Sequence, residues 1–246
     1  MSLIKYALCG LCLLGISQTQ AEEAVPTTRI LYVRHGEVPG NNPDPRTYIY
    51  TGSGTDDSLT ELGRIQAKEC AQFLSYLQQN GHCGTITALY ASDLTRAVET
   101  AEPISQALGL SIHLRQPLRE INWGCADGQL VQTMSEEYDS IVDQIEQQYP
   151  ERKTRWDYLP VFEGAETYNA LLNRTLTELK RIAELHPGET VVIVGHGRVL
   201  KTLIADLRDS EEKIPYPANC GIAEFTYSPN NGLRFIQILK REKHTH

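Results

Sequence analysis

The stretch Ile-Leu-Tyr-Val-Arg-His-Gly-Glu at residues 30–37 decides the fold of this 246-residue chain, together with Val-Val-Ile-Val-Gly-His-Gly at residues 191–197. In each stretch a short β-branched and aliphatic run leads into a histidine and a glycine. Such runs are typical of strands in a parallel sheet that is covered on both faces. Because ligands bind outside the carboxyl ends of strands in open α/β sheets, we expect His35 and His196 to lie at the same sheet edge.

Strand and helix patterns alternate outward from these two stretches. Further strands are predicted at residues 87–91, 112–114, 222–227 and 233–239, with the last two forming a hairpin. Helices are predicted from Ser58 or Thr60 to 79, from a cap at Ser92 to Gly109, over 131–148 and 166–185, and up to 207. This alternation predicts an α/β fold with three layers, α/β/α, and a mostly parallel central sheet in a single domain over residues 22–246.

Residues 1–21 have the pattern of a secretory signal peptide. Lys5 gives a positive start, residues 7–16 form an apolar core too short to span a bilayer, and Ala21 offers a small residue for cleavage before Glu22. A buried N-terminal helix is the alternative, and two glycines within the core disfavour it. We therefore expect an exported protein, periplasmic or secreted, without a stable membrane anchor. The net charge of −8 also argues against a nucleic-acid partner.

Four cysteines would remain after removal of that segment, an even number that suits an oxidising compartment: Cys70, Cys83, Cys125 and Cys220. Three pairings are possible. The pair Cys70–Cys83 is the closest in sequence, and a turn at Asn80-Gly81 could fold the chain back between them. Independent buried thiols are the alternative.

Several residues near the predicted strand ends have side chains that suit phosphoryl transfer. The guanidinium groups of Arg34 and Arg96 match phosphate oxygens bidentately, and Arg96 is expected in the first turn of its helix, off the apolar stripe. His35 could attack phosphorus through a neutral ring nitrogen and form a phosphohistidine. His196, if protonated, would add a third cationic donor, and Gly197 would let the backbone approach the phosphate.

Glu120 follows the strand at 112–114 on an irregular segment, and it is predicted to supply the proton to the leaving oxygen and to act as the base toward water. Glu37 is the second candidate. Each residue also has an ordinary structural interpretation, since a lone histidine or helical arginine is more often structural than catalytic. A metal site is disfavoured because His35 and His196 lack a close third ligand.

In chain order, these residues resemble the motifs of the histidine phosphatase superfamily in its phosphoglycerate mutase-like branch. Residues 34–37 resemble the nucleophile motif, 92–101 the segment with the second phosphate-binding arginine, 118–124 the proton-donor segment, and 195–197 the second histidine. The resemblance implies a reaction without metal or cofactor on a small phosphorylated substrate. Its catalytic residues would be His35, Glu120, His196, Arg34 and Arg96, and its phosphate-binding residues Arg34, Asn41, Arg96, His196 and Gly197.

Departures from the mutase pattern favour a phosphatase. Ile121 follows Glu120 where mutases of this branch carry an arginine, and the adjacent arginine pair that holds a substrate carboxylate is not found. The segment 163–167, Glu-Gly-Ala-Glu-Thr, resembles phosphatase members instead. We therefore predict an exported phosphomonoesterase that acts through phosphohistidine. A phosphoglycerate mutase, or a non-catalytic module that binds phosphorylated ligands or a protein, remains the alternative.

Five aromatic residues could form a wall of the substrate pocket, although aromatic residues at such spacing more often only pack together: Tyr48, Tyr50, Trp123, Trp156 and Tyr158. The sequence does not indicate the physiological substrate or the oligomeric state.

Overall fold

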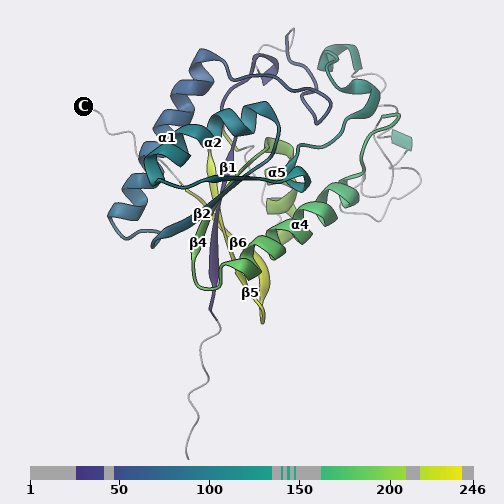
Figure 1. Ribbon diagram of the computed structural model, residues 1–246. Helices are drawn as coiled ribbons and strands as arrows, with labels where there is room; N and C mark the ends of the chain where they lie inside the picture. Colours follow the sequence, from purple (N-terminus) through teal and green to yellow (C-terminus); the bar gives the residue numbers. More distant parts are fainter. Residues whose placement is uncertain are drawn as a thin grey trace, which may run out of the picture.

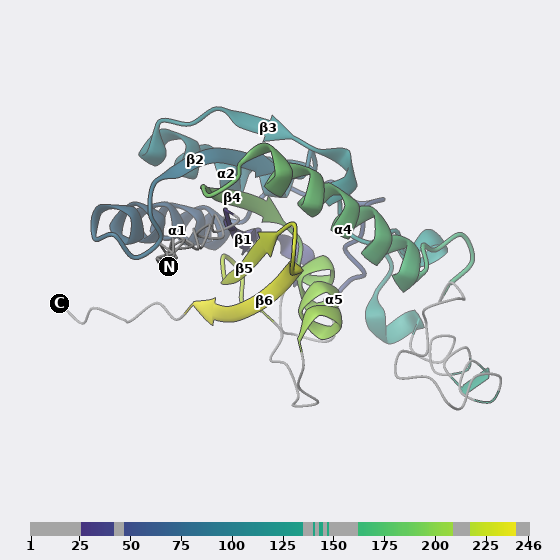
Figure 2. The ribbon, with the colours of Figure 1, turned by 90° about the horizontal axis from the view of Figure 1, so that it is seen from below.

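A computed structural model describes residues 26–41, 47–134, 140, 143–144, 147, 162–208 and 217–239 of the chain. Within these residues six strands form one central sheet (Figure 1), and the order of the strands is β3-β2-β4-β1-β5-β6 (Figure 2). The strands are β1 (Thr28–Arg34), β2 (Ile86–Ala91), β3 (Ile112–Leu114), β4 (Thr190–Gly195), β5 (Ile222–Ser228) and β6 (Gly232–Leu239). The four strands β1 to β4 are parallel, β5 is antiparallel to β1, and β5 and β6 form the predicted hairpin.

Helices cover both faces of the sheet, with α1 on one side and α4 and α5 on the other in Figure 2. The α-helices that lie wholly within the described residues are α1 (Glu61–Gln79), α2 (Thr95–Leu108), α4 (Tyr168–Leu185) and α5 (Gly197–Leu207). Short 3-10 helices lie between them: η1 (Pro39–Asn41), η2 (Gln116–Leu118) and η3 (Gly124–Ala126). The three-layer α/β fold with a mostly parallel sheet is therefore confirmed.

Strand β1 shows why both faces must be covered. Its side chains alternate between the faces, as in any strand. Ile30 and Tyr32 belong to the core cluster that α4 and α5 complete, and Leu31 and Val33 to the cluster under α1 and α2. All four side chains are almost completely buried, which explains the continuous apolar run in the sequence.

Register brings the two histidine motifs together at the carboxyl edge of the sheet. Arg34 is paired with Gly195 at the end of the β1–β4 ladder. The backbone N–H of His35 then donates to the carbonyl of Gly195 at 2.8 Å. The expectation that both histidines lie at one sheet edge is thus confirmed.

The start of α1 is one of the two that the sequence offered, whereas the starts of α2 and α4 differ from the sequence expectations. Thr60 caps α1 by accepting from the backbone N–H of Gly63 at 3.0 Å, so Ser58 is not the cap. Ser92 was the wrong choice for α2, whose N-cap is Leu94 without a side-chain hydrogen bond. Helix α4 begins one residue after the cap Thr167, not at Glu166.

Several expectations fall on residues outside the described part of the chain. These include the signal peptide at 1–21 and most of the helix expected over 131–148, of which the described residues 131–134, 140, 143–144 and 147 are helical. Cys70 and Cys83 are both described and buried, and no disulfide joins them. In the described ranges, no helix combines the length and apolar character that a membrane span requires.

Candidate active site

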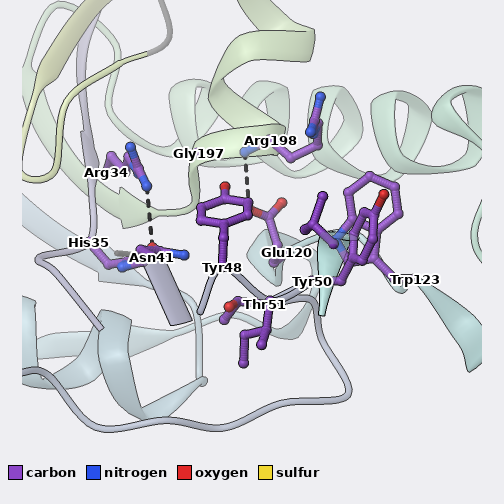
Figure 3. Close-up of a pocket in the computed structure, with 12 residues that line it drawn as sticks. Arg34, His35, Asn41, Tyr48, Tyr50, Thr51, Glu120, Trp123, Gly197 and Arg198 are labelled. Atoms are coloured by element: carbon purple, nitrogen blue, oxygen red, sulfur yellow. Dashed lines mark hydrogen bonds between the residues drawn. The ribbon is translucent and has the colours of Figure 1, made fainter. Parts of the chain in front are cut away.

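A cavity of about 140 Å³ opens at the carboxyl edge of the sheet. In Figure 3, Arg34, His35 and Asn41 lie together on one side of it, and Tyr50 and Trp123 on the other. The lining consists of Arg34, His35, Asn41, Tyr48, Ile49, Tyr50, Thr51, Glu120, Trp123, Val131, Gly197 and Arg198.

The imidazole of His35 is held in one tautomer. Its Nδ1 lies 2.7 Å from the carbonyl oxygen of Gly36, and because a carbonyl can only accept, Nδ1 carries the proton. Nε2 then keeps its lone pair. Burial, followed by the charges of Arg96 and Arg34, holds the pKa of His35 well below its usual 6.5. His35 is therefore neutral and nucleophilic at physiological pH.

His196 lies beside His35 and is completely buried, with the two ring centroids 5.3 Å apart. Its Nε2 is 2.8 Å from the hydroxyl of Ser92, and its Nδ1 has no hydrogen-bond partner among the described residues. Burial and the nearby charge of Arg96 hold its pKa well below 6.5. The protonated form considered from the sequence is thus disfavoured when the cavity holds no anion.

Arg34 and Asn41 form a fixed pair at the cavity wall. Arg34 donates from Nη1 to the carbonyl of Pro217 at 2.6 Å and from Nη2 to Oδ1 of Asn41 at 3.2 Å. Asn41 belongs to η1, directly after β1, so both side chains are positioned by the same strand end. The structure brings both of these predicted phosphate ligands to the cavity.

Arg96 lies in the first turn of α2, as predicted, but the surroundings of its side chain differ from those expected. It is completely buried rather than off the apolar face, and it is not among the residues that line the cavity. Its Nη1 and Nη2 donate to the carbonyls of Thr55 and Gly52, each at 2.9 Å, and its Nε has no hydrogen-bond partner in the described part of the chain. Its charge still lowers the pKa values of both histidines, so it acts on the site electrostatically.

Glu120 is the carboxylate at the cavity. Its Oε1 accepts from the backbone N–H groups of Ile121 and Val199 at 3.0 and 3.2 Å, and its Oε2 from that of Arg198 at 3.0 Å. The donors from residues 198 and 199 belong to the first turn of α5, where backbone N–H groups have no partner within the helix. Oε2, with one such partner, keeps a lone pair for a proton.

Glu37, the second candidate for that role, points elsewhere. Its Oε1 accepts from the hydroxyl of Thr60 at 2.9 Å, at the start of α1, and it is not among the lining residues of the cavity. The structure therefore places Glu120 at the cavity and Glu37 away from it, although the sequence offered both as candidates for the proton donor.

Arg198 is a cavity residue that the sequence analysis missed. Its guanidinium carbon lies 5.3 Å from the ring centroid of Trp123, and the Trp123 and Tyr50 rings form an edge-to-face pair. Its position directly after the second histidine motif, at the start of a helix, is a signal that could have identified it. The expected aromatic wall includes Tyr48, Tyr50 and Trp123, whereas Trp156 and Tyr158 fall outside the described residues.

Arginine side chains, rather than a metal ion, are expected to neutralise the charge of a phosphate bound in this cavity. Among the described residues, no group of three or more His, Cys, Asp or Glu side chains is arranged to hold a metal ion. The arrangement can hold a phosphoryl group between Arg34, Asn41 and the start of α5, with the Nε2 lone pair of His35 beside it.

Known proteins are similar to this chain in sequence and in fold. Residues 30–235 match the family profile of the histidine phosphatase superfamily (branch 1). Phosphoglycerate mutase-like protein 4 of Arabidopsis thaliana is 31% identical over 82% of this chain and 81% of its own length. Phosphoserine phosphatase 1 of Hydrogenobacter thermophilus is 32% identical over 68% of this chain and 70% of its own. A crystal structure of phosphoglycerate mutase from Bacillus anthracis superposes with a TM-score of 0.70 at 21% identity, covering 87% and 93% of the two chains, which shows the shared fold.

Proposed function

Because this chain belongs to the histidine phosphatase superfamily, we propose that it is an exported phosphomonoesterase that acts through a phosphohistidine on His35. Membership of the family, with relatives named as phosphatases and mutases, supports phosphatase or mutase chemistry. The observation that carries the finer proposal is the hydrogen bond from Nδ1 of His35 to the Gly36 carbonyl, which leaves Nε2 as a buried, neutral nucleophile at the cavity.

In the first step, Nε2 of His35 attacks phosphorus and the bond from phosphorus to the alcohol oxygen breaks. Arg34 and the backbone at Gly197 stabilise the charge that spreads over the equatorial oxygens. The departing oxygen takes a proton from Oε2 of Glu120, so the alcohol leaves neutral.

In the second step, water attacks the phosphohistidine. Glu120, now a carboxylate, takes one proton from that water, the bond from phosphorus to Nε2 breaks, and inorganic phosphate forms. His35 returns to its neutral form and Glu120 to its protonated form, so the cycle closes without a further reactant.

Trapping of the intermediate tests this proposal. Rapid acid-free denaturation during turnover should recover phosphate on His35 in an acid-labile, base-stable form. His35→Ala should lose both the label and turnover, because no other described side chain at the cavity offers a neutral nitrogen nucleophile. Turnover that persists in His35→Ala would contradict the covalent mechanism. A wild-type protein that binds phosphorylated ligands without any turnover would favour the non-catalytic alternative.

We also propose that catalysis needs no metal, because arginine and backbone donors can neutralise the phosphate charge. Prolonged treatment with EDTA should leave kcat unchanged. A loss that one divalent ion restores would contradict this.

Export is proposed from the composition of residues 1–21. Mass spectrometry of the protein expressed in a secreting host should find a mature N-terminus at Glu22. An intact Met1 would argue against export.

A mutase is the second candidate, favoured by one relative's name and by Arg198, whose guanidinium at the cavity could hold a substrate carboxylate. A mutase must retain its product until the phosphoryl group returns. Phosphorus NMR of 3-phosphoglycerate with the enzyme should show inorganic phosphate accumulating faster than 2-phosphoglycerate. The reverse order would establish the mutase.

A further inference from the structure

Arg174, on α4, makes an unusually complete set of contacts outside the cavity. It donates from Nε to Oε1 of Glu166 at 2.7 Å and from Nη2 to Oε2 at 2.9 Å, a bidentate ion pair. The same guanidinium donates from Nη1 to the carbonyls of Pro117 and Arg119 at 2.7 and 2.8 Å, and from Nη2 to that of Glu120 at 3.0 Å. One side chain thus binds three backbone carbonyls of the segment that ends at Glu120.

The segment that ends at Glu120 needs hydrogen-bond donors from elsewhere in the fold. After η2 ends at Leu118, residues 119–123 belong to no helix or strand, so no ladder of backbone hydrogen bonds fixes them. Carbonyl groups without such a ladder are paired by donors from elsewhere in the fold or by water. Arg174 supplies these donors, and Glu166 holds Arg174 in place.

Glu120 is consequently held from two directions. Its main chain is bound to α4 through Arg174, and its carboxylate is bound to the first turn of α5. The two helices lie on the same face of the sheet and contact each other. The charge of Arg174 also contributes to the lowered pKa of His196, which places it within electrostatic reach of the histidines.

We propose that Arg174 is a positioning residue that keeps the Glu120 carboxyl group aligned with the leaving oxygen, an inference that rests on the proposed role of Glu120 in the phosphatase reaction. Arginine is required because a planar fork of five N–H donors can serve a carboxylate and three carbonyls at once. Lysine has three donors at one point and cannot serve them all.

The test compares substrates with good and poor leaving groups. An alkyl alcohol needs a proton as it departs and p-nitrophenolate hardly does, so misplacement of the acid affects the alkyl phosphate selectively. We expect Arg174→Lys to slow single-turnover phosphoenzyme formation from an alkyl phosphate by roughly ten- to a hundredfold, and from p-nitrophenyl phosphate by less than about threefold. Single turnovers are needed because slow hydrolysis of phosphohistidine would hide the contrast.

Arg29→Lys is the matched control. Arg29 also pairs with a carboxylate, Glu224, at 2.9 Å and donates to the carbonyl of His82, but it lies near the start of β1, away from the cavity. The Arg29→Lys variant should lose about as much stability as Arg174→Lys, measured as the midpoint of thermal unfolding. The ratio of its rates on the alkyl and p-nitrophenyl phosphates should not change. Equal losses on both substrates in Arg174→Lys, or no loss at all, would overturn the inference.

Two further variants keep the result decisive. Glu166→Gln removes the ionic partner of Arg174 and should give a smaller loss with the same selectivity; if Arg174→Lys does not fold, a non-selective result in Glu166→Gln overturns the inference. Glu120→Gln separates the two hypotheses. If it shows no selectivity, the proposed role of Glu120 fails; if it is selective while Arg174→Lys is not, only the role of Arg174 fails.

Discussion

The hydroxyl of Ser92 is the hydrogen-bond partner of the buried His196 ring. Its oxygen accepts from the backbone N–H of Leu94 at 3.3 Å and lies 2.8 Å from Nε2 of His196. When the hydroxyl donates to Nε2, the ring proton lies on Nδ1. A neutral His196 can then donate from Nδ1 to a phosphoryl oxygen.

Ser92→Ala should lower kcat/KM by roughly tenfold or more, because the buried ring loses the hydrogen-bond partner that holds it in place. The loss should be equal for alkyl and p-nitrophenyl phosphates, since His196 acts on the phosphoryl oxygens and not on the leaving group. Steady-state assays on both substrates check this. A loss confined to the alkyl phosphate would assign His196 to proton delivery instead.

Residues at the site differ in how far the sequence could predict them. His35 and His196 could be placed because each ends an apolar strand whose burial sets its direction. The burial of Arg96 could not be predicted, since its carbonyl partners Gly52 and Thr55 lie in a loop without periodic pattern. Arg174 was missed for a related reason: carbonyl groups are common to all residues, so its contacts leave no motif.

At the scale of elements, β1 and α1 are joined by a close approach of two glycines. A Cβ on Gly36 would lie 2.6 Å from the carbonyl oxygen of Gly63, and a Cβ on Gly63 would overlap the main chain of Glu37. Helix α1 thus packs directly on the turn whose carbonyl orients His35. The strands and helices could be predicted from apolar periodicity, whereas this contact between backbones depends on tertiary packing.

Gly63→Ala should destabilise the protein and lower activity at least tenfold, although alanine is favoured over glycine in helices by about 1 kcal/mol. The added methyl group must push α1 away from Glu37 and shift Gly36, which misplaces Nε2 of His35. Denaturant unfolding and kcat/KM measure the two effects. Arg64→Ala, at the next and half-exposed position, is the control and should change neither. A Gly63→Ala variant that is more stable and fully active would show that α1 can move away from Glu37 without displacing His35.

For the whole molecule, the two buried histidines link stability to pH. Their folded pKa values lie well below 6.5, so the unfolded chain binds more protons than the folded chain just below that pH. The free energy of unfolding should therefore be highest above pH 6.5 and fall as the pH decreases, by up to about 1.4 kcal/mol per pH unit for each histidine.

Urea unfolding between pH 7.5 and 5.5 measures this slope. A double variant, His35→Asn and His196→Asn, should show a shallower dependence, which separates the histidines from the carboxylates of the same protein. Identical slopes in the two proteins would mean that other groups carry the linkage.

Trp123 gives the protein an optical reporter of its own site. The chain has two tryptophans, and Trp156→Phe would leave the indole at the cavity as the single one. An arginine stacked on that ring makes its emission sensitive to any anion that draws the guanidinium away. Titration of the single-tryptophan protein with inorganic phosphate should therefore yield a saturable fluorescence change, so that occupancy could be followed in real time without a chromogenic substrate.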